Sequence, residues 1–459
     1  MMNSTLRVLR TTGIAAATMV ATTGLLAQQA KSVTPSASAV PNYPRYRLVE
    51  FPPLGGATSG SFGASKQLNS RGEAIAQSDT AIPIPDCPGC LVGHGVVLER
   101  NGLMTDLGAL PGINASVPVG ISESGLIAGF STYGLLVPWQ AVLWNRDRSI
   151  VALGTFGGTC STAYSVNNRG QVVGMALNAV PENPDFAAAI ARDCPAATQA
   201  RAVRWQDGSM LDLGTLGGND AAAIEVNEGG QIVGISYTDT LPNDTTGIPT
   251  IHPFLWQNGT MTDLGSLGGT QAFPGTFGGG GTRAVNDSGE VAGTSMLPGD
   301  QVWHAFFWSH GTMIDLGTFG GSKSEAFALS KKGQVLGRAV VTDTPFVRHA
   351  FLWEKGHMTD LHTVAGCTRS TAQSINPANQ IVGSLGGCAD NPDDPTFFSA
   401  FYVEKGKPMA DLNTLIDPPS PIHIDEAWNI NERGEIFGSG FLPDGSTRAF
   451  LLVPLPGSH

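Results

Sequence analysis

The chain has 459 residues, of which 41% are apolar, which is enough for a large core and excludes a wholly disordered protein. Its net charge is −12, from 38 acidic and 26 basic residues, and this argues against nucleic acid as a partner because nucleic-acid binding needs clustered Lys and Arg. The 59 glycines follow no collagen-like period and indicate many turns.

The first predicted element is an export signal. Arg7 and Arg10 precede an uncharged stretch from Thr11 to Ala27. This layout is typical of a secretory signal peptide, which we assign to residues 1–30, followed by a flexible Ser/Pro/Ala linker at residues 31–45. An uncleaved membrane anchor is the alternative, but the stretch is short for a span and rich in threonine. We therefore expect an extracellular or periplasmic protein without a membrane span after cleavage.

From about Gly55 onward one unit recurs, built from an N-x-x-G turn, an "AFLW" phrase and an "MTDL" phrase, although Asn379 replaces the turn glycine in the seventh copy and the second copy, "WNRDRS", lacks the glycine after its tryptophan. Asn or Ser at the first turn position and Gly at the fourth suit type I turns in short hairpins. A second short turn follows the tryptophan of the "AFLW" phrase. Each unit therefore predicts four short β-strands. The eight turns, spaced 44 to 60 residues apart, begin at Asn69, Ser122, Asn167, Asn227, Asn286, Ser330, Asn376 and Asn431.

The third strand of each unit is apolar on both sides: Phe351 and Trp353 point one way, Ala350 and Leu352 the other. A sheet with one wet face would alternate apolar and polar residues, so each four-stranded sheet must be covered by neighbours on both faces. Four-stranded sheets that repeat and stack in this way describe a β-propeller. We expect an all-β propeller of about eight four-stranded blades, with seven blades or an open β-solenoid as alternatives.

The two ends of the repeat region predict how the propeller closes. The last unit has its third strand, Arg448 to Pro456, and no fourth, whereas an extra strand, Tyr46 to Phe51, precedes the first unit. The N-terminal strand should therefore complete the last blade and leave no open sheet edge. This makes residues 46–456 a single propeller domain, which we expect to be a monomer.

The combined phrase "HAF-x-W…DLG-x-x-GG…VN-x-x-G-x-x-x-G" resembles the HAF-repeat family of predicted extracellular bacterial proteins. The similarity covers nearly everything from Gly55 onward, with weaker first and seventh copies that read "GVVLER" and "SAFYVEKG" in place of the HAF phrase. The resemblance implies export and a repeat architecture. It implies no activity and no catalytic residue.

Six cysteines in an exported chain predict disulfides. In a propeller the short turns lie on one face, while the crossovers and the loops between second and third strands lie on the other. Two cysteine pairs each occupy both of these longer loops within one unit, and the third pair closes a small ring within one loop. The predicted pairs are Cys160–Cys194, Cys367–Cys388 and Cys87–Cys90. A redox role for this C-x-x-C would need a βαβ setting, which the repeat does not provide.

No metal site or cofactor is predicted. His252, His304 and His349 occupy one repeat position, but equivalent atoms on neighbouring blades would lie on the order of 10 Å apart, too far for one zinc ion with bonds of about 2.0–2.1 Å. We expect these histidines to make polar or stacking contacts within their blades, and the recurring Asp residues likewise. The acidic loop from Ala389 to Pro395 could hold calcium, but it lacks a regular ligand spacing and reads as a solvated loop.

The predicted ligand-binding candidates are charged residues on innermost strands, where a scaffold alone would favour small or apolar residues. They could contact a ligand near the propeller axis, with mutual pairing or contact with channel water as the alternative. They are Lys66, Glu225, Arg283, Glu325 and Glu426.

Unequal loops on the crossover face also favour binding there. We expect a secreted binding or interaction scaffold that uses this face for a glycan, peptide or protein. The alternative is a hydrolase or lyase that acts on an extracellular polymer at the channel mouth. No catalytic residue can be assigned from the sequence, because nothing in it joins the charged candidates into an acid–base pair.

Overall fold

A computed structural model describes residues 43–457, except residues 62–64, 86, 134–135, 191–193, 195–197, 277–282 and 389–397. The predicted signal peptide, most of the predicted linker and the acidic loop at 389–395 therefore lie outside the described residues. All the strands of the described residues lie in the segment Pro41–His459. Among the described residues, no helix has the length and apolar character needed to cross a membrane.

The regular structure of the segment Pro41–His459 consists almost entirely of β-strands. The first three sheets contain β2 (Gly55–Gly60), β3 (Glu73–Pro83), β4 (Leu91–Glu99), β5 (Met104–Asp106); β6 (Ala115–Ile121), β7 (Ile127–Tyr133), β8 (Leu136–Trp144), β9 (Ile150–Ala152); and β10 (Gly157–Val166), β11 (Val172–Pro181), β12 (Thr198–Gln206), β13 (Ser209–Asp212). The next two contain β14 (Ala221–Val226), β15 (Ile232–Tyr237), β16 (Ile251–Gln257), β17 (Thr260–Asp263); and β18 (Ala272–Pro274), β19 (Val291–Met296), β20 (Trp303–Ser309), β21 (Thr312–Asp315).

The remaining sheets continue the same order. They contain β22 (Ser324–Leu329), β23 (Val335–Asp343), β24 (Phe346–Glu354), β25 (His357–His362), β26 (Cys367–Ile375), β27 (Gln380–Cys388), β28 (Phe398–Glu404), β29 (Ala410–Asp411); and β30 (His423–Ile430), β31 (Ile436–Phe441), β32 (Thr447–Pro454) with β1 (Tyr46–Glu50). A short helix α1 (Pro184–Ile190) lies between β11 and β12, and a 3-10 helix η1 (Leu412–Leu415) follows β29.

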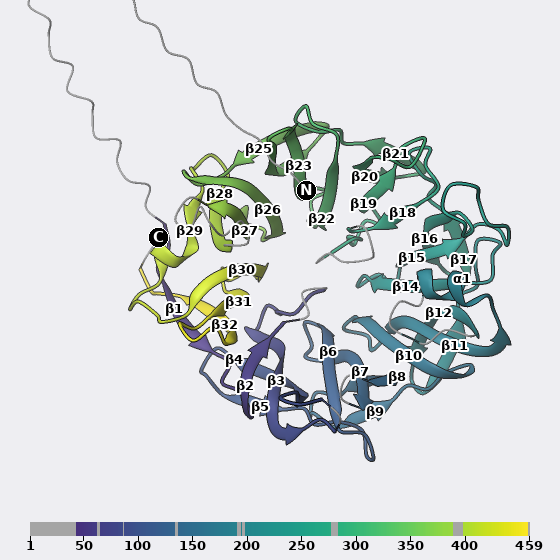
Figure 1. Ribbon diagram of the computed structural model, residues 1–459, viewed down its shortest axis with the longest axis horizontal. Coiled ribbons are helices and arrows are strands. Elements are labelled where there is room, and N and C mark those ends of the chain that lie inside the picture. The colour runs from purple at the N-terminus through teal and green to yellow at the C-terminus, as the bar shows by residue number, and fades with distance from the viewer. Residues whose placement is uncertain are drawn as a thin grey trace, which may run out of the picture. The chain divides into compact units, whose positions relative to one another are not determined.

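Consecutive strands of each four-stranded group are neighbours and antiparallel. Figure 1 shows the sheets one after another around a common centre, with β6, β14, β22 and β30 near that centre. This is the β-propeller arrangement, and it confirms the predicted fold class. One parallel bridge, Arg348 to Arg369, joins β24 to β26, so the described strands form seven sheets but eight groups of four. None of these sheets closes on itself, and the number of blades stays a prediction.

The core consists of layers between adjacent sheets, because each third strand is apolar on both sides. In β16, Phe254 and Trp256 pack against residues of the preceding sheet, while Leu255 between them packs against the following sheet. In β20, Phe306 and Phe307 divide in the same way. The double-sided apolar pattern therefore buries both faces of each of these sheets, as the sequence predicts.

In the last five units a glycine in the second strand makes room for the phenylalanine ring of the third strand. A Cβ atom on Gly234 would lie 2.1 Å from the carbonyl oxygen of Ala222 and 2.5 Å from the Phe254 ring. The same contact recurs between Gly337 and Phe351. The second-strand glycine and the third-strand phenylalanine are therefore two halves of one packing contact, which explains why they recur together in these units.

The N-x-x-G turns join neighbouring sheets as well as their own strands. The Oδ1 atom of Asn227 accepts a hydrogen bond from the Gln231 amide at 2.9 Å, and its Nδ2 donates to the carbonyl oxygen of Asn286 in the next sheet at 2.8 Å. Asn69, Asn167, Asn286, Asn376 and Asn431 donate in the same way to the next turn. Ser122 and Ser330 retain the bond within the turn through Oγ but have no amide to donate.

The N-terminal strand β1 completes the last sheet. Tyr46 to Glu50 pair antiparallel with Pro454 to Phe450 of β32, as the sequence predicts. The last sheet also contacts the first, since Asn431 Nδ2 donates to the carbonyl oxygen of Asn69 at 2.9 Å. The two ends of the series of sheets therefore meet, which leaves no place for the open β-solenoid alternative.

The three predicted disulfides are all present. Cys160 of β10 pairs with Cys194 in the long segment between β11 and β12. Cys367 of β26 pairs with Cys388, which lies directly opposite it on β27, so this bond joins two neighbouring strands and not the two loops that the sequence predicts. Cys87 pairs with Cys90 within the long segment between β3 and β4. The predicted pairing is confirmed, and the described residues contain no free cysteine.

Candidate functional site

A β-bulge interrupts most of the innermost strands shortly before the N-x-x-G turn. In six units the register of the inner strand shifts by one residue, for example between Ala223 and Glu225, so that one extra residue stands out of the ladder. This residue always lies three positions before the first residue of the N-x-x-G turn. The six bulge residues are Val119, Tyr164, Ile224, Phe327, Gln373 and Trp428.

The first and fifth units carry longer interruptions at this place. Their inner strands stop at Gly60 and at Pro274, and pairing resumes only at Leu68 and Val285. The residues three positions before the turn are here Lys66 and Arg283. Both predicted cationic candidates therefore occupy the bulge position, which is apolar in most of the other units.

A cavity of about 330 Å³ lies among the inner segments of the first six units, from Lys66 to Leu329. Five of the eight bulge-position residues line it: Lys66, Val119, Tyr164, Ile224 and Arg283. Apolar walls come from α1, from β14 and β15 of the fourth sheet and from β18 of the fifth, through Ile190, Ala222, Ile235, Phe273 and Pro274. The cavity thus combines an apolar wall with a few charged groups, as small-molecule and peptide sites do.

The cavity also reaches the face of the short N-x-x-G turns. Turn residues contribute Glu123, Glu228, Asp287 and Lys331 to its lining. The sequence predicts binding on the opposite, irregular-loop face, and α1 of the longest loop does contribute Ile190. The cavity is therefore not restricted to the loop face, because its charged end is built by the more uniform turns.

A smaller cavity of about 160 Å³ adjoins the first. The two share Glu123, Arg283 and Lys331, while Pro377 and Glu432 from the turns on the far side line only the smaller one. Arg283 therefore lies where the two cavities meet.

Lys66 and Glu123 form an ion pair at the edge of the cavity. Burial lowers the pKa of Lys66, and the nearby Arg283 lowers it further. Burial alone would raise the pKa of Glu123, but the Lys66 ammonium and a 2.6 Å hydrogen bond from the Ser70 amide outweigh it and hold this pKa at about 2. The Lys66 ammonium and the Glu123 carboxylate therefore bind mainly to each other.

Glu225 is half-buried and faces the cavity from β14. Its Oε2 accepts hydrogen bonds from the backbone amides of Ala284 at 2.5 Å and Val285 at 3.3 Å in the next sheet. Burial raises the pKa of Glu225 to about 7, against the opposing effect of those two bonds and of Arg283 and Lys66. The carboxyl group therefore links two sheets and changes its charge near neutral pH.

Arg283 differs from its charged neighbours. Its side chain is half-buried, and among the described residues it makes no hydrogen bond and no ion pair, although Glu225 and Lys66 are near enough to interact electrostatically. Its backbone is held in place because the carbonyl oxygen accepts a 2.8 Å hydrogen bond from the Leu329 amide. The guanidinium thus lines the cavity with donor groups that have no acceptor among the described residues.

The other two predicted candidates lie outside both cavities. Glu325 accepts hydrogen bonds from Arg338 at 3.0 Å and from the Trp303 indole at 3.2 Å. Burial, together with the neighbouring Asp425, raises the pKa of Glu426 to about 7. These two glutamates lie five positions before their turns, whereas Lys66 and Arg283 lie three positions before theirs. Of the five predicted candidates, only Lys66, Glu225 and Arg283 line the same cavity.

The recurring histidines pair with the recurring aspartates of their own sheets. His252 Nδ1 lies 3.0 Å from the Asp263 carboxylate, and His304 Nδ1 lies 2.9 Å from that of Asp315. In the third unit Arg201 takes the place of the histidine and lies 2.9 Å from Asp212. The predicted polar contacts within the blade are therefore present, and the histidines of different sheets are not brought together.

The sequence matches no family model, and a comparison with curated proteins also finds no match. The HAF-repeat resemblance therefore stays a prediction. Solved structures similar to this chain include the β-propeller domain of the Trilobed protease from Pyrococcus furiosus, at 9% identity and a TM-score of 0.45 over 78% of this chain and 96% of that one.

Two peptidases are also similar to the chain. The puromycin-hydrolyzing peptidase of Mycobacterium tuberculosis has 14% identity and a TM-score of 0.45, and the match covers 86% of this chain but 61% of that one. Dipeptidyl peptidase 4 of Porphyromonas gingivalis has 12% identity and a TM-score of 0.45, with coverage of 82% and 56%. The chain thus spans less than two thirds of either peptidase.

Proposed function

We propose that this protein is an exported binding scaffold that holds a carboxylate-bearing peptide in the central cavity, with the carboxylate against Arg283. The observation that carries the proposal is the half-buried guanidinium, which has no hydrogen-bond or ion-pair partner among the described residues. The three disulfides support export, because such bonds persist in oxidising compartments.

A half-buried guanidinium is costly when its donors have no acceptor. Its planar fork matches a carboxylate in two parallel hydrogen bonds, and such charge-assisted bonds are among the strongest in proteins. The acidic groups that line the cavity all accept hydrogen bonds already: Glu123 from Lys66 and Ser70, and Glu225 from two backbone amides. Glu228 accepts one from the Asn168 amide, and Asp287 accepts one from the Glu228 amide. An external carboxylate is therefore the best complement to Arg283.

The rest of the cavity favours a peptide over a sugar. Its wall next to the charged end is formed by Ile190, Ile224, Ile235 and Phe273, which suit an aliphatic or aromatic side chain. Its volume of about 330 Å³ is at the lower end of the usual range for ligand sites, so it would enclose only one or two residues of a longer ligand. We expect a free C-terminus or an acidic side chain beside an apolar one.

An array tests this proposal with two arms. The purified protein is applied to peptides that end in a free carboxylate or in an amide, and to oligosaccharides with and without uronic acids. We expect binding to carboxylate-ended peptides with an apolar last or next-to-last residue, and loss of binding on amidation. Preference for uronic-acid sugars, or indifference to the carboxylate, would contradict the proposed ligand class.

Calorimetry on the best array peptide then tests the residue. Arg283→Gln should weaken binding by roughly 10- to 100-fold, because it removes a charge-assisted hydrogen bond. Arg146→Gln removes an exposed arginine outside the cavity and is the charge-matched control, with unchanged affinity. Equal affinities of the wild type and Arg283→Gln would reject Arg283 as the anchoring residue.

The alternative from the sequence is a hydrolase or lyase at the channel mouth. Its support is that Glu225, with a pKa of about 7, shares the cavity with Arg283. Against it, the Glu225 carboxylate already accepts two backbone hydrogen bonds, and Glu325 and Glu426 lie elsewhere. Mass spectrometry of the array ligands after long incubation distinguishes the two functions, since cleaved or unsaturated products would favour the enzyme.

A further inference from the structure

One unit departs from the repeated arrangement at the end of its fourth strand. In four other units a glycine follows two positions after the recurring Asp, and its amide donates to the carboxylate of that Asp at 2.7 to 2.9 Å. These glycines have positive φ angles, for example 71° at Gly317. In the sixth unit the position is His362, with φ 61°, and its amide makes the same bond to Asp360 at 2.6 Å.

A histidine at this position has no structural advantage over glycine, because residues with a side chain rarely adopt positive φ angles. The fold of this unit therefore does not account for His362. What distinguishes it from the glycines is an imidazole next to the recurring His–Asp pair.

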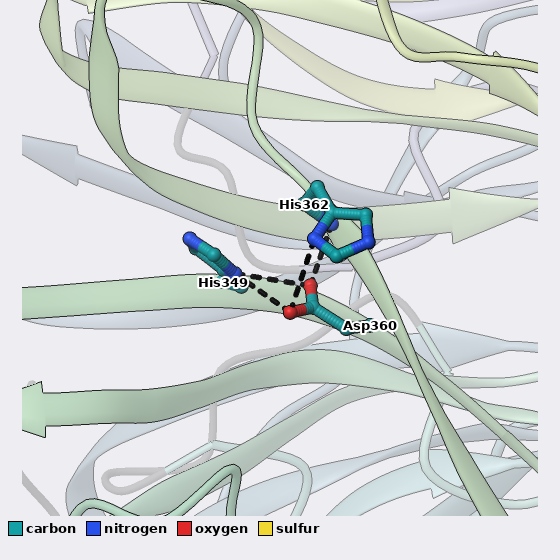
Figure 2. Close-up of side chains that lie close together, drawn as sticks. All are labelled: His349, Asp360 and His362. Atoms are coloured by element: carbon teal, nitrogen blue, oxygen red, sulfur yellow. Dashed lines mark hydrogen bonds and ion pairs between the residues drawn. The ribbon is translucent and has the colours of Figure 1, made fainter.

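Figure 2 shows that His349, Asp360 and His362 converge on one point. The Nδ1 atom of His349 lies 2.8 Å from Asp360 Oδ2, and the Nδ1 atom of His362 lies 3.2 Å from the same oxygen. The three ligand atoms all lie within 4.8 Å of one another. The side chains of His349 and Asp360 are mostly buried, with 18% and 24% of their surface exposed, whereas His362 is 74% exposed.

We propose that His349, Asp360 and His362 form a binding site for a divalent transition-metal ion of the zinc type. Two imidazole nitrogens and one carboxylate oxygen are ligands that zinc accepts, with bonds of about 2.0–2.2 Å. In a tetrahedron with such bonds, two ligand atoms lie about 3.3 Å apart, close to the separations of both nitrogens from the Asp360 oxygen. Only small side-chain adjustments are needed to place one ion among the three.

The chemistry of the ligands favours zinc over calcium, because calcium takes oxygen ligands and this site offers two nitrogens. Three protein ligands leave a fourth position of zinc open, and the exposure of His362 places that position toward solvent. The site is thus suited to bind an ion that also takes a water molecule or a ligand group. It is independent of the Arg283 cavity, whose lining contains none of the three residues.

Calorimetric titration of untagged protein with zinc chloride, after treatment with a chelator, tests the site. The wild type should bind one ion with a sharp stoichiometric transition, and cobalt(II) should give the visible absorption bands of a tetrahedral site. His362→Gly restores the residue of the other units, so the fold is expected to be kept. It should weaken zinc binding by roughly 100-fold or more, since loss of a ligand exceeds the 10- to 100-fold cost of removing a supporting residue.

Two further variants make the outcome unambiguous. His357→Ala removes an exposed histidine of the same strand and should leave the affinity unchanged. His362→Asn tolerates the positive φ angle and keeps a polar side chain, and it should lose zinc as His362→Gly does. Zinc binding that persists at full affinity in His362→Gly or His362→Asn, or is lost in His357→Ala, would overturn the assignment.

Discussion

At the scale of single residues, the repeated phrases are explained by contacts that each unit makes again. The second-strand glycine recurs because the third-strand phenylalanine and a first-strand carbonyl oxygen occupy the space that a side chain would need, as at Gly234. The His and Asp of the repeat form a polar pair across the third and fourth strands, as His304 and Asp315 do. A residue that recurs in most units is thus a packing or pairing residue, and function is to be sought where the units differ.

The glycine contact predicts a large loss of stability for Gly234→Ala. The added methyl group would lie 2.1 Å from the Ala222 carbonyl oxygen, so the backbone of β14 or β15 must shift. We expect the free energy of unfolding to fall by about 3 kcal/mol, at the upper end of the cost of overpacking a core. Urea denaturation measures the loss, and Gly60→Ala is the control because no atom of the described residues lies within 4 Å of the position of its Cβ. Similar small losses in both variants would contradict the packing explanation.

Glu225 predicts a pH dependence of stability. Its pKa is about 7 in the folded protein against an ordinary value of 4.5, mainly because of burial. A raised carboxyl pKa contributes stability that is fully present below pH 4.5 and is lost as the pH rises to 7. Glu225→Gln cannot ionise and keeps an oxygen for the amides of Ala284 and Val285.

The free energy of unfolding of wild type minus Glu225→Gln should therefore fall by about 3 kcal/mol between pH 4 and pH 8. The comparison isolates Glu225 from Glu426 and Asp425, whose pKa values are also raised by burial and which are present in both proteins. Urea denaturation at the two pH values measures the difference. Parallel pH profiles of the two proteins would show that Glu225 does not titrate in this range.

The charged candidates show what a sequence alone can locate at this scale. The sequence alone shows that these charged residues stand on strands where most units have small or apolar residues, and Lys66, Glu225 and Arg283 do line one cavity. The sequence did not predict which of the charged residues face the cavity, because the inner-strand bulge changes the side of the sheet to which the following residues point. Counting back three positions from each turn would have separated Lys66 and Arg283 from Glu325 and Glu426.

At the scale of elements, strands and turns follow from the repeat, whereas the bulges and cavities do not. Turn positions were predictable because Asn and Gly have distinct roles in a type I turn. That the turn asparagine also reaches the next sheet was not, because a side-chain bond between units leaves no trace in the spacing of one unit. The stability that an asparagine contributes can be divided between the bond within the turn and the bond to the next sheet. Ser122 and Ser330 show how, because they retain only the bond within the turn.

Asn227 allows this division to be measured. Asn227→Ser keeps an acceptor for the Gln231 amide and loses the bond to the Asn286 carbonyl oxygen, so it should cost about 1 kcal/mol. Asn227→Ala leaves the Gln231 amide and the Asn286 carbonyl oxygen without their bonds to this side chain, and it should lower the free energy of unfolding by about 2–3 kcal/mol. Equilibrium urea denaturation of the two variants gives these values. Equal losses would contradict the assignment of separate roles to the turn bond and the bond between sheets.

At the scale of the whole propeller unit, β1 is the element on which the arrangement depends. Tyr46 is fully buried and lies 6.2 Å from Tyr402, ring to ring, so β1 packs against the sheet that precedes its own. On the other side, Val49 of β1, with Phe51 directly after the strand, packs with the last sheet and the first, in a cluster that includes Phe437 and Leu68. One strand of five residues thus contacts three sheets. Its role was predictable because an unpaired strand preceded the first repeat and the last repeat lacked one.

Removal of β1 therefore should affect the whole domain rather than one sheet. A variant that begins after Pro52 leaves the β32 edge unpaired and exposes the apolar surface that Tyr46 and Phe51 cover. Open edges of this kind pair with other chains, so we expect loss of the cooperative thermal transition and self-association in light scattering. A synthetic peptide of residues 43–52 should restore both by adding the missing strand, as β-strand addition does. The same peptide with Tyr46→Lys should not, because it would place a charge in the cluster around Tyr402. A monomeric, cooperatively unfolding truncated chain would show that the sheets hold together without this strand.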